Sequence, residues 1–176
     1  MHKCSKLIIS DLNLSEGSFV LATIHRQENT DDLAKLSSIF EALDRIHKDC
    51  EVVLPLHPRT KNILEKNNIA TSITLIDPVG YYAMLELLKN CKMVVSDSGG
   101  LQKEAFFNNK HCIIAREETE WIELVENGFA EVVGSDVASI MQAFEKFQHS
   151  EKDFSMELYG NNVGEKIYQS IKSLIE

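Results

Sequence analysis

Residues 94–104 read Val94-Val95-Ser96-Asp97-Ser98-Gly99-Gly100-Leu101-Gln102-Lys103-Glu104, a short β-branched run that passes through a Ser-Gly-Gly turn into helix-forming sequence. The first N–H groups of a helix lack intrahelical partners, the helix dipole places partial positive charge there, and glycine lets a ligand approach the backbone. The stretch therefore predicts a strand followed by a helix whose N-terminus binds an anion. Because the pattern is neither a Walker A loop nor GxGxxG, a plain structural turn stays open as an alternative.

Glu104 follows the Ser-Gly-Gly turn by one helical turn. It lies on the same face of the predicted helix as Gly100, and its side chain leans back toward the helix N-terminus. A carboxylate in that position can accept hydrogen bonds from sugar hydroxyls. One element of the chain would then hold both the diphosphate and the ribose of a nucleotide.

The composition favours one globular domain that binds a small ligand. The chain has 176 residues, of which 44% are hydrophobic and 26% charged, and a formal net charge of −9. This charge argues against nucleic acid or anionic membranes as partners. No apolar run approaches the roughly 18 residues of a membrane span, and residues 1–4 do not start a signal peptide, so we expect a cytoplasmic protein.

The cysteines give no sign of a metal or of a disulfide framework. They are widely spaced, and the sequence holds no CxxC pair, HExxH motif or cluster of His and Cys with metal-ligand spacing. We expect reduced thiols that mostly pack in the core, no structural metal and no cofactor. The four residues are Cys4, Cys50, Cys91 and Cys112.

Short apolar runs alternate with stretches of helical periodicity along the chain. The runs that we expect to be buried strands are residues 18–23, 51–56, 73–76, 92–96, 112–115 and 131–133. The expected helices are 33–46 with a cap at Asn29 or Thr30, one through 64, 82–88, one from 100, one from a Thr119 cap through 125, 136–147, and one or two helices in 156–176 broken at 160–162. This alternation predicts an α/β fold with a doubly wound parallel sheet, Rossmann-like, over residues 18–176. Residues 1–17 are expected to be a connector.

This fold brings two distant segments together. In the strand order 3-2-1-4-5-6 the first and fourth strands are neighbours, and ligands bind outside their carboxyl ends, where the winding direction reverses. The first predicted strand ends at His25 and Arg26, and the fourth ends at Ser98, Gly99 and Gly100. An imidazole and a guanidinium would therefore face free backbone donors across one crevice, which favours phosphate binding.

Four sequence strings carry a resemblance to a known family. They are His25-Arg26-Gln27-Glu28-Asn29, Pro55-Leu56-His57-Pro58, Ser96-Asp97-Ser98-Gly99-Gly100-Leu101-Gln102-Lys103-Glu104-Ala105 and Arg116-Glu117-Glu118-Thr119-Glu120. In order and spacing, residues 17–147 resemble the UDP-N-acetylglucosamine 2-epimerase family. Its members have two Rossmann-like domains that face each other across a cleft, the GT-B arrangement, and this chain resembles only the second. The resemblance implies a missing N-terminal catalytic domain and a full-length homodimer.

The resemblance also implies which residues bind the UDP-sugar. Ser98, Gly99 and Gly100 would hold the phosphates, Glu104 would accept from the ribose hydroxyls, and His25, close to the diphosphate, is the catalytic candidate.

Other positions carry open alternatives. Arg26 is a phosphate ligand or a partner of Glu28, and Arg116 is a further basic group at the nucleotide. His57 is a contact to a second, regulatory UDP-sugar or a turn residue before Pro58. Asp97 is expected to be a structural turn acceptor, and Gln102 and Lys103 are expected to be solvated.

The family inverts C2 of the sugar by anti elimination of UDP and its return to a 2-acetamidoglucal intermediate. The resemblance places the carboxylates that move protons on the first domain, so this half would stabilise the leaving group, and the chain alone is expected to show no turnover. Trp121 stands where the N-acetylglucosamine enzymes have arginine, as in the branch that epimerises UDP-2,3-diacetamido-2,3-dideoxyglucuronic acid. Trp121 is then a sugar contact or core filler. The donor-binding half of a GT-B glycosyltransferase and a non-catalytic nucleotide-binding module remain alternatives.

Overall fold

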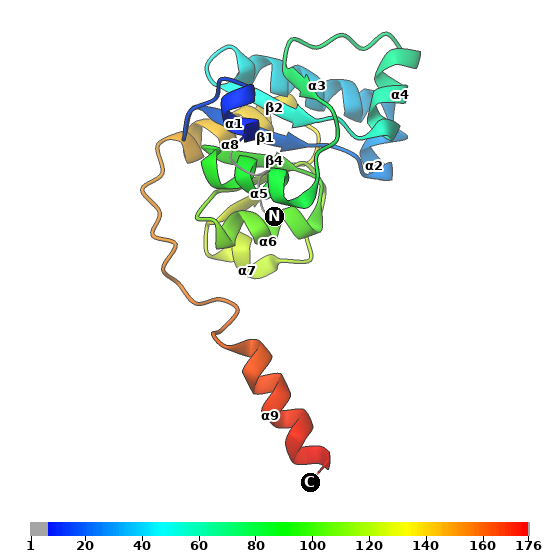
Figure 1. The fold of residues 1–176 in the computed structure, drawn as a ribbon. Helices are drawn as coiled ribbons and strands as arrows, with labels where there is room; N and C mark the ends of the chain where they lie inside the picture. The colour runs from blue at the N-terminus through cyan, green and yellow to red at the C-terminus, as the bar shows by residue number, and fades with distance from the viewer. Residues whose placement is uncertain (1–6, 176) are drawn as a thin grey trace.

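Six parallel strands form one sheet in the order β3-β2-β1-β4-β5-β6 in the computed structural model, which describes residues 7–175 (Figure 1). The strands are β1 (Phe19–Thr23), β2 (Glu51–Pro55), β3 (Thr74–Ile76), β4 (Met93–Ser96), β5 (Cys112–Ile114) and β6 (Ala130–Val132). The winding direction reverses between the neighbouring strands β1 and β4. The predicted doubly wound, Rossmann-like sheet is therefore confirmed.

Helices cover both faces of this sheet. The helices of the described residues are α1 (Leu7–Asp11), α2 (Gln27–Thr30), α3 (Leu33–His47), α4 (Pro58–Lys66), α5 (Tyr81–Asn90), α6 (Gly99–Phe107), α7 (Ile122–Glu126), α8 (Val137–Gln148) and α9 (Val163–Ile175), of which α9 does not pack on the sheet. One core cluster packs α3 and α8 on the sheet, and a second packs α5, α6 and α7 on the other face. Successive residues of β1 alternate between the two clusters, which is why this strand is a continuous apolar run.

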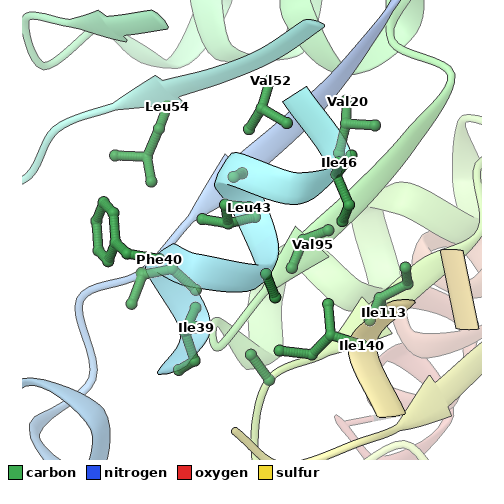
Figure 2. Packing of buried hydrophobic residues seen from close by; sticks show 14 of the residues in the cluster. Val20, Ile39, Phe40, Leu43, Ile46, Val52, Leu54, Val95, Ile113 and Ile140 are labelled. Atoms are coloured by element: carbon green, nitrogen blue, oxygen red, sulfur yellow. The ribbon is translucent and has the colours of Figure 1, made fainter. Parts of the chain in front are cut away.

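Helix α3 supplies much of the first core cluster. Figure 2 shows Phe40, Leu43 and Ile46 of this helix beside the strand residues Val20 and Val95. The apolar side chains of α3 recur at helical spacing, so one face of the helix is buried while the opposite face stays polar.

Two of the predicted helix caps are wrong. Helix α3 is capped by Asp32, whose carboxylate accepts from the N–H groups of Ala34 and Lys35, and not by Asn29 or Thr30. Those two side chains are buried in the short helix α2, where the Asn29 amide donates to Asp97 and to the Ala115 carbonyl. Helix α7 begins at Ile122, and Thr119 instead forms a turn in which its hydroxyl accepts from the Trp121 N–H.

The N-terminal end of the described chain differs from the expected connector, whereas the C-terminal end agrees with the prediction of one or two helices after a break at 160–162. Within the predicted connector, Ile8 and Ile9 of α1 pack against the second core cluster and Leu14 is buried, so this part belongs to the core. The C-terminal segment holds one helix, α9, which extends away from the domain (Figure 1). Gly160 and Asn162 adopt left-handed backbone conformations, which stop a helix from beginning earlier. No helix within residues 7–175 is long and apolar enough to span a membrane.

The described cysteines are free thiols, and Cys4 lies outside the described residues. Cys91 and Cys112 are buried and Cys50 is half-buried. Burial raises the pKa of the Cys91 thiol to about 12, so this thiol stays protonated and packs as a small apolar group.

His111 ties the start of β5 to the segment that follows α8. Its Nδ1 lies 3.2 Å from the Phe129 carbonyl oxygen, its Nε2 lies 2.8 Å from the Ser150 hydroxyl, and its ring stacks on Phe147 with centroids 4.3 Å apart. Because a carbonyl can only accept, the neutral ring carries its proton on Nδ1 and accepts from Ser150 at Nε2.

His111 should make the fold less stable in acid. Burial, together with the charges of Lys146 and Lys152, lowers the pKa of this imidazole below 6.5. The unfolded chain therefore takes up the proton first, and the stability that neutral His111 contributes is lost as pH falls through the lower pKa of the folded state. Urea unfolding at about pH 7.5 and about pH 5.5 should show a smaller loss of stability on acidification for His111→Gln than for wild type. The exposed His149→Gln should behave as wild type, and identical losses in all three proteins would contradict the assignment.

Candidate functional site

The candidate site lies at the carboxyl edge of β1 and β4. These strands pair in register from Val20 opposite Met93 to Thr23 opposite Ser96, and the last two side chains share a hydrogen bond of 2.7 Å. Just beyond them a cavity of about 340 Å³ opens. It is lined by Thr23, His25, Pro55, His57, Pro78, Val79, Met84, Ser98, Gly100, Leu101 and Glu104. A larger hollow beside α4 and β3 includes none of the site residues predicted from the sequence.

The cavity gathers several of the predicted site residues from three different segments. Ser98, Gly100 and Glu104 come from α6 and its cap, His25 follows β1, and His57 follows β2. The rings of His25 and His57 lie 5.7 Å apart between their centroids. Sequence reasoning missed the apolar wall of Val79, Met84 and Leu101, for which the only signal was the Asp-Pro turn that ends β3.

Asp97 fixes the loop that carries His25 and Arg26. Its carboxylate is fully buried and accepts from the backbone N–H groups of both residues at 2.9 to 3.1 Å, and from the Asn29 amide at 3.2 Å. The His25 Nδ1 lies 3.6 Å from the Asp97 Oδ1. The expected turn acceptor is thus confirmed, although the turn that it holds belongs to the neighbouring strand.

The N-terminus of α6 is open toward Arg26. Ser98 caps this helix without a side-chain cap bond, and its own N–H donates to the Ser96 hydroxyl at 2.9 Å. A Cβ on Gly99 would lie 3.1 Å from the Glu120 Oε2 and 3.6 Å from an Arg26 guanidinium nitrogen. A side chain at Gly99 would crowd the Glu120 carboxylate, so glycine leaves room for this carboxylate and for the exposed Arg26 side chain beside the helix N-terminus.

Arg116 does not line the cavity, which differs from its predicted role at the nucleotide. Its side chain is 5% exposed, with Nε donating to Glu28 at 3.0 Å and Nη1 donating to both oxygens of Glu120 at 2.9 and 3.0 Å. Burial acts to lower the pKa of this guanidinium, yet the two carboxylates raise it overall. Arg116 thus joins the 25–30 segment to the loop after β5, and Glu28 pairs with it and not with Arg26.

Trp121 also lies outside the cavity lining. Its indole Nε1–H donates to the Gly99 carbonyl oxygen at 2.7 Å, and Lys103 covers its ring. The prediction that the Gln102 and Lys103 side chains are solvated is wrong. Gln102 is fully buried and accepts from the Thr119 hydroxyl, and Lys103 is half-buried. Among the described residues, the Gln102 amide nitrogen has no partner.

A doubly wound parallel sheet, with a helix N-terminus at its switch point and a carboxylate one turn along that helix, defines a Rossmann-like domain. Comparison with known proteins gives the family. The chain belongs to the UDP-N-acetylglucosamine 2-epimerase family, whose model matches residues 2–172.

Curated relatives show how much of the family's length is present. The chain is 50% identical over 122 residues to the UDP-2,3-diacetamido-2,3-dideoxy-D-glucuronate 2-epimerase of Pseudomonas aeruginosa, which covers 69% of this chain and 34% of that protein. It is 36% identical over 173 residues to a UDP-N-acetylglucosamine 2-epimerase homolog of Methanococcus maripaludis, covering 95% of this chain and 48% of that protein. The chain therefore spans about a third to a half of the curated relatives it matches.

Solved structures agree with the fold. The UDP-GlcNAc 2-epimerase of Methanocaldococcus jannaschii, in complex with UDP-GlcNAc and UDP, superposes with a TM-score of 0.84 at 30% identity over 97% of this chain and 49% of that one. A glycosyltransferase of kitacinnamycin superposes with a TM-score of 0.58 at 14% identity, which shows a shared fold alone.

Proposed function

We propose that this domain binds the UDP part of a UDP-2-acetamido sugar, as the nucleotide-binding half of an enzyme that inverts C2 by elimination and re-addition of UDP. One observation carries the proposal. His25 from the end of β1, the open α6 N-terminus at Ser98 and Gly100, and the carboxylate of Glu104 converge on one cavity in a member of an epimerase family. Together they offer donors for a diphosphate and an acceptor for a ribose.

The chemistry of this half is leaving-group stabilisation. As the bond between C1 and the diphosphate breaks, negative charge grows on the phosphate oxygens, and donors that are already in place lower the energy of that state. The helix N-terminus, Arg26 and His25 supply such donors, and buried Asp97 holds the last two in position. The proton transfers at C2 would belong to carboxylates of an opposing N-terminal domain. The same proposal includes a full-length homodimer in the cytoplasm and no turnover by this chain alone.

Two UDP-2-acetamido sugars are candidates for the substrate: UDP-N-acetylglucosamine and UDP-2,3-diacetamido-2,3-dideoxyglucuronate. The 50% identity to the Pseudomonas aeruginosa enzyme favours the second of them. The 14% identity to a glycosyltransferase gives no comparable support for a donor-binding role in that class.

UDP should bind this chain more tightly than ADP does. The reason is the size and lining of the cavity, whose 340 Å³ and apolar wall of Pro78, Val79 and Met84 suit a pyrimidine better than a purine. Titration calorimetry with UDP, ADP and NAD measures this directly. Equal affinities for UDP and ADP would contradict the proposed base site, and no detectable UDP binding would contradict the proposed function.

A further inference from the structure

We propose that Trp121 is a positioning residue for the phosphate site, because its indole N–H fixes the peptide unit whose opposite end faces the cavity. This inference rests on the proposed function, since it concerns where the diphosphate of the nucleotide binds. It assigns to Trp121 neither of the roles expected from the sequence, which were a sugar contact and core filler.

The argument begins with the peptide that joins Gly99 to Gly100. The indole Nε1–H donates to the Gly99 carbonyl oxygen at 2.7 Å. That carbonyl belongs to the same planar peptide as the Gly100 N–H, and in a trans peptide the two groups point in opposite directions. Gly100 lines the cavity and Trp121 does not. The indole therefore holds the carbonyl side of this peptide. The Gly100 N–H, on the opposite side, faces the space that a phosphate would fill.

A peptide between two glycines has particular need of such a support. Neither residue carries a side chain that could anchor the unit, and glycine tolerates alternative backbone conformations that other residues avoid. A hydrogen bond to the carbonyl fixes the orientation of the peptide plane. It also polarises the peptide, so the N–H at the other end becomes a better donor.

The indole is itself held in place by its neighbours. Its backbone N–H donates to the Thr119 hydroxyl at 3.1 Å. The Lys103 ammonium lies 4.0 Å from the ring centroid of Trp121 and 4.0 Å from that of Tyr159, so the cation is enclosed between two aromatic faces. Tyr159 comes from the segment after α8, which links the position of the indole to the C-terminal part of the chain.

The Lys103 ammonium explains why an aromatic residue suits the position of Trp121. An arginine at this position would bring a guanidinium next to the Lys103 ammonium, and the two cations would repel each other. An indole instead attracts the ammonium to its face and still supplies one N–H donor.

The test uses Trp121→Phe, which keeps a ring for Lys103 and Tyr159 but removes the N–H. We expect the melting temperature to stay close to that of wild type, UDP affinity to fall by about tenfold, and uridine affinity to stay unchanged because uridine has no phosphate. Tyr159→Phe, which keeps the aromatic pair and the indole, is the matched control and should bind UDP as wild type does.

Unchanged UDP affinity in folded Trp121→Phe would overturn the inference, as would an equal loss for UDP and uridine. If the variant does not fold, the wild-type protein decides, because its single tryptophan gives one indole N–H signal in an NMR spectrum. UDP, but not uridine, should shift that signal, and an unmoved signal with UDP bound overturns the inference. Wild type that binds no UDP would refute the proposed function instead, so the two failures are distinguishable.

Discussion

Replacing Glu104 with alanine should weaken UDP binding by about 1 to 3 kcal/mol, roughly a 5- to 150-fold rise in Kd. Glu104 lies one turn into α6, half-buried, and lines the same cavity as Ser98 and Gly100. Its carboxylate would accept from the ribose hydroxyls while the helix N-terminus holds the diphosphate. The loss is large because a charged acceptor is removed from hydroxyls that have left water to meet it.

The measurement is calorimetry with two ligands. Wild type should bind a dideoxyribose analogue of UDP more weakly than it binds UDP. Glu104→Ala should bind UDP and the analogue equally, since the partner of the ribose hydroxyls is gone. Glu65→Ala, at an exposed glutamate beside the separate hollow near α4, is the matched control. Equal UDP affinity for wild type and Glu104→Ala would remove the ribose role.

The central strands β1, β2, β4 and β5 could be predicted from the sequence because they are buried on both faces. A short continuous run such as 18–23, set between stretches of helical periodicity, is typical of a covered parallel strand, and β1 occupies Phe19–Thr23. The convergence of His25 with Ser98 and Gly100 also followed from topology alone, since the switch point fixes which strand ends are neighbours.

The roles of individual polar side chains could not be predicted in the same way. Arg116 and Glu28 are separated by 88 residues, and only the folded chain shows that their ion pair uses the donors that were expected to meet a nucleotide. Likewise, the pattern gave no reason to place the indole of Trp121 behind α6. Pairing of this kind depends on which partner is nearest in space, and periodicity carries no such information.

Replacing Asp97 with alanine should have the largest effect on stability at the site. The carboxylate is fully buried and accepts from two backbone N–H groups and one amide, all in the segment after β1. Alanine would leave those donors unpaired next to the core, and a buried donor without a partner costs more than an ordinary hydrogen bond is worth. We expect a loss of about 2 to 4 kcal/mol in the free energy of unfolding.

Two comparisons separate this structural effect from the functional one. Asp32→Ala removes an exposed helix cap that also accepts two backbone N–H bonds, and should cost only about 1 kcal/mol. Asp97→Asn keeps the shape but replaces one acceptor with a donor, so it should fall between the two in urea unfolding. UDP binding should also weaken in Asp97→Asn, because His25 and Arg26 lose their fixed positions, while Asp32→Ala should bind normally. If Asp97→Ala were no less stable than Asp32→Ala, the loop would be held by contacts other than this carboxylate.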